Sequence, residues 1–319
     1  MAVNGFKLVR IIFTIKSTRI IIKGLVAISF IILGISIPVK GQSASRNVID
    51  QLGRQVTLPY APQRIIALAP SITEIIFALG QEHRLKGVTR FSDFPPEAAK
   101  LPKVGSYVHL DLERIVALKP DLCIANKDGN PREVVTLLES YNIPVYAVDP
   151  INSSGIINTV LEIGRLLNSE EKAKILTQNM YSRIQRVKSL VKKVDHRPRV
   201  FFQIGISPIV SVGTGTFIHE LIVLAGGKNL AAGTVQYPRF SREQVLGLSP
   251  EVFIVTSMAK TDAFERMKSE WNLWTNIPAV KNQRIHRLDS AIFNRPTPRL
   301  VNGLEQLARV IHPELFEGE

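Results

Sequence analysis

The sequence predicts an α/β protein of two lobes, each with a mostly parallel sheet flanked by helices, and the lobes joined by one long helix. Apolar strand-like runs alternate with amphipathic helical patterns, as in βαβ units. A pattern of short elements also occurs twice, with a long helical pattern between the copies. The chain of 319 residues is long enough for two lobes of ordinary domain size.

The first strand and helix of the body lie at residues 64–80. An apolar run at 64–69 predicts a strand, and the helix after it ends at Gly80, a residue that commonly terminates helices. Ser71 and Glu74 have the spacing of a capping box, in which each side chain bonds a backbone N–H of the first turn. We therefore expect Glu74 to stabilise the start of this helix.

The repeated pattern links two parts of the chain. Each copy opens with a capping residue, carries a glutamate two positions later, and places a proline between a short helix and a buried strand. A second pair of matching helices, each ending at glycine, occurs in the same order. The copies are DLERIVALKPDLCIA (111–125) and SREQVLGLSPEVFIV (241–255), with TEIIFALG (73–80) and HELIVLAG (219–226) as the second pair.

A single long helix is expected between the two copies. Its apolar residues recur at helical spacing between charged residues: Ile175, Met180, Ile184, Val187 and Val191. The expected division is an N-terminal lobe at 42–167, a bridging helix at 168–194 and a C-terminal lobe at 195–319. Because a helical bridge is stiff, we expect only a modest change of lobe angle on ligand binding.

Residues 1–41 have the composition of a targeting segment. A basic region ends at Lys23, and an apolar run (25–39) follows it. A run of about 15 residues is short for a spanning helix, which needs roughly 20. We expect a signal peptide cleaved after Gly41, or alternatively after Ala44, and keep an uncleaved anchor as the other alternative. No cysteine follows the apolar run, which excludes a lipoprotein anchor.

The net charge of +13 does not indicate nucleic-acid binding. Residues 1–41 hold six basic and no acidic residues, which leaves +7 on the remainder. No stripe of lysine or arginine with interleaved aromatic residues occurs there, so we expect no nucleic-acid partner. The single cysteine, Cys123, lies in an apolar strand pattern and predicts a buried structural thiol.

The sequence offers no catalytic motif and no metal site. It has no Gly-x-Ser-x-Gly elbow and no evident Ser–His–Asp set. The Gly-rich segment 212–216 lacks the spacing of a phosphate loop and is interpreted as a strand-to-helix turn. The six histidines lack metal-ligand spacing, although His109, near Tyr107, could coordinate an iron or cobalt centre. We therefore predict a binding protein and not an enzyme.

Aromatic residues stand at loop positions after the predicted strands. In open α/β sheets, ligands bind beyond the carboxyl ends of the strands. Several loop aromatics are therefore interpreted as the walls of a cleft, and flat apolar walls with few charges suit a bulky, partly apolar ligand. These residues are Phe91, Phe94, Tyr107, Tyr237 and Phe293.

The glutamates of the repeat, Glu113 and Glu243, occupy the first turns of their predicted helices. A carboxylate there interacts favourably with the helix dipole, which is a sufficient structural reason for both. Their equivalence adds a functional interpretation, because one exposed carboxylate per lobe suits docking onto a symmetric, basic partner.

On these residues the chain resembles the periplasmic cobalamin-binding proteins that serve vitamin B12 ABC importers. These proteins belong to the wider helical-backbone family that also binds iron–siderophores and haem. The resemblance runs from about Arg64 to the end of the chain. It is most specific at FSDFPPEA (91–98), LERIVALKPDL (112–122), Gln203–Ile206 and SREQVL (241–246).

The resemblance implies the roles of particular residues. The ligand-binding residues would be Phe91, Tyr107, Asn126, Tyr237, Asp289 and Arg295, and the permease-docking residues would be Glu113 and Glu243. Family members often carry tryptophan at the positions of Tyr107, Asn126 and Tyr237, whereas this chain has only Trp271 and Trp274.

The resemblance also implies a function. We expect a monomeric periplasmic protein, without a catalytic cofactor, that captures cobalamin or a related corrinoid in the cleft between its lobes. It would deliver the ligand to an ABC importer permease with its ATPase subunits. The alternatives are a haem or ferric-siderophore binding protein of the same fold and, from another class, an extracytoplasmic hydrolase.

Overall fold

The computed structural model describes residues 45–256 and 261–317. The expected leader at 1–41 and its cleavage sites after Gly41 or Ala44 lie outside these residues. Within them, no helix combines the length and the apolar character needed to cross a membrane. The described chain opens with an antiparallel hairpin of β1 (Ser45–Ile49) and β2 (Gln55–Pro59).

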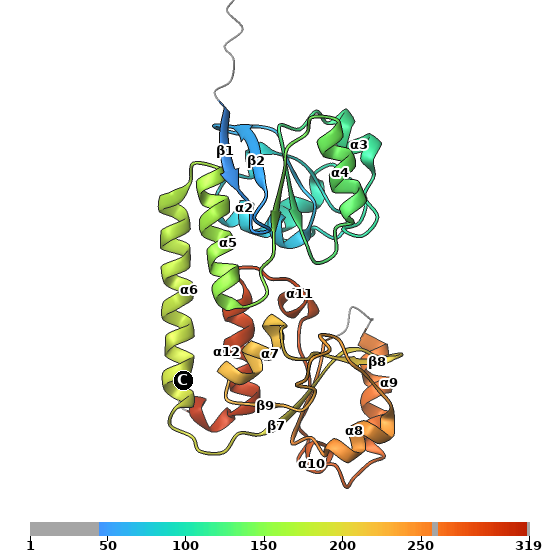
Figure 1. The fold of residues 1–319 in the computed structure, drawn as a ribbon. Coiled ribbons are helices and arrows are strands. Elements are labelled where there is room, and N and C mark those ends of the chain that lie inside the picture. Colours follow the sequence, from blue (N-terminus) through green and yellow to red (C-terminus); the bar gives the residue numbers. More distant parts are fainter. Residues whose placement is uncertain (1–44, 257–260, 318–319) are drawn as a thin grey trace, which may run out of the picture. The chain divides into compact units, whose positions relative to one another are not determined.

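A four-stranded parallel sheet of order β4-β3-β5-β6 follows the hairpin. We call the part built on this sheet the N-terminal lobe (Figure 1). Its strands are β3 (Ile65–Ala67), β4 (Leu85–Val88), β5 (Leu122–Asn126) and β6 (Val145–Val148). Its helices are α2 (Pro70–Ala78), α3 (Leu112–Ala117) and α4 (Arg132–Ser140), with short 3-10 turns at Glu82–Arg84 and Pro96–Lys100.

The C-terminal lobe is built on a six-stranded sheet of order β10-β8-β7-β11-β12, with β9 also paired to β7. Its strands are β7 (Arg199–Gly205), β8 (Ile209–Ser211), β9 (Lys228–Asn229), β10 (Arg239–Phe240), β11 (Val252–Val255) and β12 (Ile285–Arg287). Its helices are α7 (Phe217–Leu224), α8 (Arg242–Leu248), α9 (Thr261–Asn272), α10 (Pro278–Lys281), α11 (Ser290–Phe293) and α12 (Leu300–Ile311), followed by a 3-10 turn at Pro313–Phe316.

The two sheets share one arrangement of parallel strands. The order β4-β3-β5-β6 in the first corresponds to β9-β7-β11-β12 in the second. The antiparallel strands β8 and β10 are an addition on the β9 side of β7. The matching helices α2 and α7 both end before a glycine with positive φ, Gly80 at 65° and Gly226 at 85°. The structure thus shows at the level of topology the repeat that the sequence pattern indicates.

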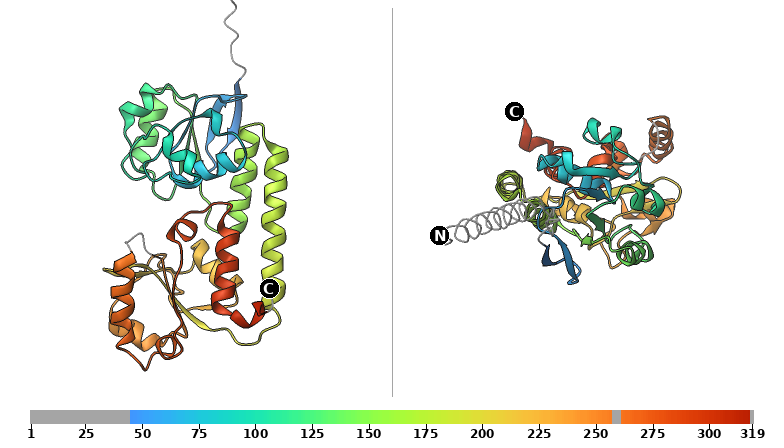
Figure 2. Two further views of the ribbon diagram at one scale, coloured as in Figure 1. Left: turned by 180° about the vertical axis from the view of Figure 1, so that it is seen from behind. Right: turned by 90° about the horizontal axis from the view of Figure 1, so that it is seen from above.

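Alternating side chains give each sheet a core on both faces. In β3, Ile65 and Ala67 face one hydrophobic cluster and Ile66 faces another, because successive strand residues point to opposite faces. In β7, Val200 and Phe202 face one cluster while Phe201 faces the other. Helices cover both faces, and the predicted α/β fold class of two lobes joined by one long helix is confirmed (Figure 2).

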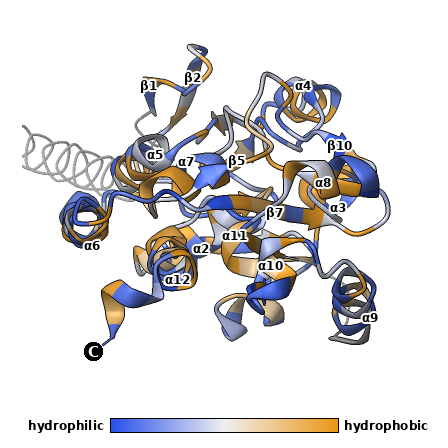
Figure 3. Cartoon of the chain, turned by 90° about the horizontal axis from the view of Figure 1, so that it is seen from below, coloured by the Kyte–Doolittle hydropathy of each residue, from blue (hydrophilic) through white to orange (hydrophobic). Residues whose placement is uncertain are grey.

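Helix α6 (Glu170–Val191), 22 residues long, is the predicted long helix between the lobes. At 1.5 Å per residue it spans about 33 Å. Its Ala173 packs in the N-terminal core, whereas Met180 and Ile184 pack in the C-terminal core. Its outer surface is largely hydrophilic (Figure 3). Helix α5 (Ser153–Leu166) lies beside it, so two helices, not one, contribute to both cores (Figure 1).

The start of α2 differs from the sequence expectation. The helix begins at Pro70, its N-cap residue is Ala69, and no side chain caps it. Glu74 therefore stands in the second turn, where its carboxylate cannot reach back to the N-cap N–H, and Ser71 is buried. The predicted capping box of Ser71 and Glu74 is wrong, and the Glu74 side chain has a different partner.

Candidate ligand-binding site

The predicted aromatic residues of the N-terminal lobe lie beyond the carboxyl ends of its strands. Phe91 follows β4, and Tyr107 lies in a loop closed by a bridge between Gly105 and Leu110. The two rings form an edge-on pair with centroids 6.5 Å apart. The Arg90 guanidinium lies 4.8 Å from the centroid of the Phe91 ring. The structure thus brings these two predicted wall residues together.

The backbone after β5 is shaped to receive the Tyr107 ring. Gly129 has φ of 120°, and a Cβ there would come within 2.5 Å of a ring carbon of Tyr107. Only glycine tolerates both the conformation and the close approach. Tyr107 itself remains 39% exposed, so part of the residue is available for contact with a ligand.

Asn130 fixes the loops around this ring. Its side chain donates to the backbone carbonyls of Leu68 at 2.8 Å and Tyr107 at 2.7 Å. Its carbonyl oxygen accepts from the backbone N–H of Asn126 at 2.7 Å. Asn126, a predicted ligand contact, is the last residue of β5 and is only 8% exposed. Sequence analysis did not identify Asn130, although an asparagine after a buried strand is a recurrent loop-fixing element.

Tyr237 approaches the same region from the C-terminal lobe. Its hydroxyl lies 3.4 Å from the carboxylate of Asp128, in the loop after β5. Partial burial, the Asp128 carboxylate and the Tyr107 hydroxyl together raise the pKa of Tyr237 to about 12. We call Phe91, Tyr107 and Tyr237 the aromatic site. Its three rings come from two lobes and from loops far apart in the sequence.

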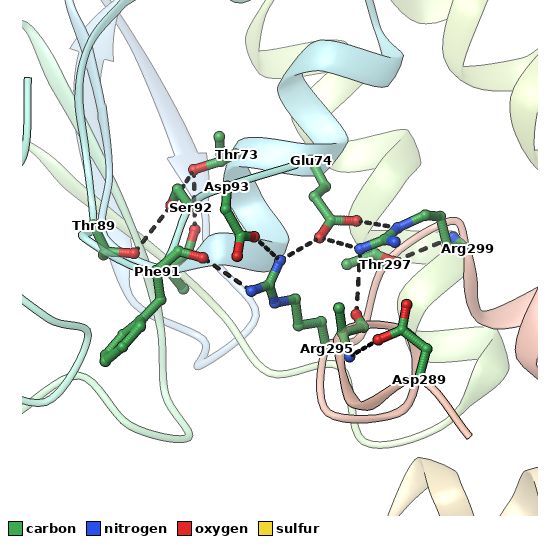
Figure 4. A network of polar contacts seen from close by, with 12 residues as sticks. Thr73, Glu74, Thr89, Phe91, Ser92, Asp93, Asp289, Arg295, Thr297 and Arg299 are labelled. Carbon is green, nitrogen blue, oxygen red and sulfur yellow. Dashed lines mark hydrogen bonds and ion pairs between the residues drawn. The ribbon is translucent and has the colours of Figure 1, made fainter. Parts of the chain in front are cut away.

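The predicted ligand contact Arg295 has protein partners in this structure. Its guanidinium donates to Asp93 at 2.7 Å, to Glu74 at 3.1 Å and to the backbone carbonyl of Phe91 at 2.9 Å (Figure 4). Its side chain is 13% exposed. The other predicted contact, Asp289, is exposed and caps α11 by accepting from the N–H of Ala291 at 2.8 Å.

Glu74 is the buried centre of this polar network. Arg299 donates to both of its carboxylate oxygens, each at 2.7 Å, and the Glu74 side chain is only 3% exposed. The Phe94 ring lies under the Arg299 guanidinium, with 3.8 Å to the ring centroid. We call Glu74, Asp93, Arg295 and Arg299 the interlobe clamp, because its carboxylates come from one lobe and its arginines from the other.

The ion pairs of the interlobe clamp shift the pKa values of its own side chains. Partial burial raises the pKa of Asp93, but the hydrogen bond and positive charge of Arg295 outweigh it and hold that pKa below its usual value. Burial alone would lower the pKa of Arg295, but the hydrogen bonds to Asp93 and Glu74 outweigh burial and raise this pKa above its usual value. Two carboxylates thus balance two guanidinium groups within the clamp.

Glu74 and Arg299 were missed as partners by sequence analysis. A signal exists for Glu74, which is the only charged residue of an otherwise apolar helix, SITEIIFALG. A carboxylate in such a setting needs a buried partner. Nothing local points to Arg299, which lies 225 residues away.

The two predicted docking glutamates occupy equivalent, exposed positions. Glu113 is the second residue of α3 and Glu243 the second residue of α8. The capping residues are as predicted, since Asp111 accepts from Arg114 and Ser241 accepts from Gln244. The backbone of its own helix and the Ser241 hydroxyl lower the pKa of Glu243. Its carboxylate is therefore charged at neutral pH.

The remaining sequence candidates have structural explanations. The interpretation of Phe293 as a cleft wall is wrong, because its side chain is fully buried in the C-terminal core. Cys123 is fully buried, and burial raises the pKa of its thiol, so it is not a nucleophile. Thr216 ends the Gly-rich segment and caps α7, which makes that segment a strand-to-helix turn. His109 is exposed. In the described part of the chain, no three His, Cys, Asp or Glu side chains gather as a metal site.

Residues 65–292 match the family described as "Periplasmic binding protein". The vitamin B12-binding protein of Vibrio parahaemolyticus is 33% identical over 244 residues, which are 76% of this chain and 86% of that protein. An uncharacterised ABC transporter substrate-binding lipoprotein of Bacillus subtilis is 30% identical over 274 residues, covering 84% of this chain and 86% of that protein.

Solved structures show the same fold. The periplasmic vitamin B12 binding protein of Vibrio cholerae has a TM-score of 0.72 at 29% identity, covering 82% of this chain and 100% of that one. A periplasmic haem-binding protein from Roseiflexus has a TM-score of 0.71 at 25% identity, covering 79% and 99%.

The chain belongs to the periplasmic binding protein family. It is accordingly a substrate-binding protein of the ABC-transporter type that acts outside the cytoplasm, and the predicted resemblance to vitamin B12-binding proteins is confirmed.

Proposed function

We propose that this protein binds cobalamin or a related corrinoid between its lobes and delivers it to an ABC importer. The aromatic site carries this proposal, because the Phe91 and Tyr107 rings form a pair and Tyr237 of the other lobe reaches Asp128, next to the Gly129 that packs on Tyr107. A corrinoid is large, flat and partly apolar, and stacking against aromatic faces suits such a ligand. The similarity to vitamin B12-binding proteins supports the same ligand.

Binding and release require no bond rearrangement, so no general acid, base or nucleophile is needed. We therefore propose a transport protein without enzymatic activity or a catalytic cofactor. Asn126, Asp289 and Arg295 remain proposed polar contacts, although Arg295 would have to share its guanidinium with the clamp.

Titration calorimetry with cyanocobalamin tests the ligand. We expect one site per chain, and up to about tenfold weaker binding for Phe91→Ala, because an aromatic contact contributes roughly 0.5–1.5 kcal/mol. Tyr181→Ala is a matched control, since that tyrosine is 60% exposed on the bridging helix α6. No heat of binding to the unchanged protein would contradict the proposal.

Haem is the second candidate, favoured by the Roseiflexus neighbour and by the exposed Tyr107 and His109. The two ligands use Tyr107 differently, because haem iron needs the phenol oxygen whereas stacking needs only the ring. Tyr107→Phe should therefore leave cyanocobalamin affinity unchanged. If an absorbance titration shows that haem binds, and Tyr107→Phe abolishes coordination of the haem iron, the protein is a haem-binding protein instead.

We also propose that Glu113 and Glu243 dock onto arginines of the permease, which works with its ATPase subunits. Replacing both by alanine should abolish uptake while leaving ligand affinity intact. The matched control is Glu133→Ala with Glu171→Ala, because these glutamates are also exposed second residues of helices, α4 and α6. Normal uptake by the Glu113/Glu243 variant would contradict the docking role.

The remaining expectations concern the state of the mature protein. We propose a periplasmic monomer released by cleavage after Gly41, or after Ala44. N-terminal sequencing and light scattering of exported material test both points, and an intact Met1 would show an uncleaved anchor.

A further inference from the structure

The Glu74 carboxylate is held by two arginines from the opposite lobe. Arg299 grips both oxygens in the bidentate geometry that suits a guanidinium and a carboxylate, and Arg295 adds a third contact at 3.1 Å. With 3% of its side chain exposed, the carboxylate has few alternatives to these donors. The position of one lobe's helix α2 is thus tied to the loop between α11 and α12 of the other.

The same arginines hold the loop that carries Phe91. Arg295 donates to the Phe91 carbonyl at 2.9 Å and to Asp93 at 2.7 Å, and Arg299 covers the Phe94 ring. Each contact joins an arginine of the C-terminal lobe to residues 91–94 of the N-terminal lobe, and Figure 4 shows the two hydrogen bonds of Arg295.

A second set of bonds fixes this loop from within its own lobe. The Ser92 hydroxyl lies 3.0 Å from both Thr73 and Thr89, and all three residues are buried. Thr73 precedes Glu74 on α2. The same helical turn therefore contacts the loop directly through the Thr73 hydroxyl and holds the arginines that bind the loop through the Glu74 carboxylate. The loop is therefore held by hydrogen bonds from both lobes.

We propose that Glu74 is a positioning residue of the ligand site. Through Arg295 and Arg299 it fixes the Phe91 loop and the spacing of the two lobes before a ligand arrives. This inference rests on the proposed function for the role of Phe91, but not for the effect on lobe spacing. The clamp would act mainly by preorganising the site, because a buried, hydrogen-bonded charge pair can fix one geometry without adding net stability over apolar packing.

The experiment measures the distance between the lobes with and without Glu74. Spin labels at Ser140→Cys on α4 and Lys281→Cys on α10 occupy exposed positions in the two lobes, and buried Cys123 does not react. Pulsed electron resonance of the protein without ligand should give one narrow distance. Glu74→Gln should broaden the distribution. Cyanocobalamin should narrow it again.

Affinity supplies the second measurement. If the binding-competent arrangement falls to a tenth of the population, the apparent affinity for cyanocobalamin falls about tenfold with one site per chain retained. Glu162→Gln is the matched control, because that carboxylate bonds Gln51 and Tyr146 within one lobe and should change neither measurement. If Glu74→Gln does not fold, Arg299→Lys, which keeps the charge and loses the bidentate grip, replaces it.

An unchanged distance distribution in Glu74→Gln or Arg299→Lys would overturn the proposal, as would an unchanged affinity. Failure of this proposal can be distinguished from failure of the proposed function. If cyanocobalamin does not bind the unchanged protein, the ligand is wrong, whereas the distance measured without ligand still decides whether the clamp sets the lobe spacing.

Discussion

The interlobe clamp and the contact between Tyr237 and Asp128 both join the two lobes, and they differ in almost every physical respect. The interlobe clamp is buried, charged and bidentate, with oxygen–nitrogen distances of 2.7 Å between Arg299 and Glu74. The contact of Tyr237 with Asp128 is a single exposed hydrogen bond of 3.4 Å between a phenol and a carboxylate. The polar contacts at the clamp therefore hold the two lobes together more firmly than the single hydrogen bond of Tyr237 does.

The largest effect should come from breaking the clamp. Glu74→Gln leaves two guanidinium groups without their shared carboxylate, and removing one partner of a buried pair lowers the free energy of unfolding by about 3–5 kcal/mol. Glu139→Gln breaks the half-exposed pair with Arg54 as the control and should change stability by less than about 1 kcal/mol. Urea unfolding measures both, and equal effects would show that the clamp is no stronger than a surface pair.

A smaller, pH-dependent effect on stability should come from Asp93, the exposed carboxylate of the clamp. Because the folded pKa of Asp93 lies below its usual 3.8, ionised Asp93 stabilises the fold above that pH, and the contribution disappears as the pH falls through the folded value. The Asp93 side chain is 65% exposed, so solvent screening limits the contribution to less than about 1 kcal/mol.

Asp93→Asn should therefore be slightly less stable than the unchanged protein at pH 7, and the difference should vanish once the pH falls below the folded pKa of Asp93. Denaturant unfolding across this range measures the difference. A gap between the two proteins that stays constant with pH would assign the effect to packing instead of charge.

The smallest effect on stability should come from the exposed contact. Tyr237→Phe removes only a long hydrogen bond and should change the free energy of unfolding by less than about 0.5 kcal/mol. The ring remains, so cyanocobalamin affinity should also persist, whereas Tyr237→Ala should weaken it. Calorimetry on the two variants separates ring from hydroxyl, and a large loss in Tyr237→Phe would make the hydroxyl the ligand contact.

The features that were predicted correctly depend on residues close together in the sequence. The caps Asp111 and Ser241, the glycine ends of α2 and α7 and the long helix α6 follow from patterns within a few residues. The loop positions of Phe91 and Tyr107 follow from the rule that ligand sites lie beyond the carboxyl ends of parallel strands.

What the sequence could not predict depends on distant partners. Helix α2 begins two residues earlier than the expected cap at Ser71 allows, so Glu74 is not part of a cap but the centre of the clamp. Its arginine partners lie more than 200 residues away, and no periodicity relates them to it. Tyr237 and Asp128 are likewise 109 residues apart in the sequence, and only the fold brings their loops together.

The ligand is the central claim, and one competition experiment tests it most directly. The purified protein is mixed with equimolar cyanocobalamin and haem, freed of unbound ligand by gel filtration, and its visible spectrum is recorded. We predict the absorption bands of a corrinoid in the protein fraction, and their loss in Phe91→Ala. A Soret band, or a protein fraction without colour, would contradict the assignment of this site to cobalamin.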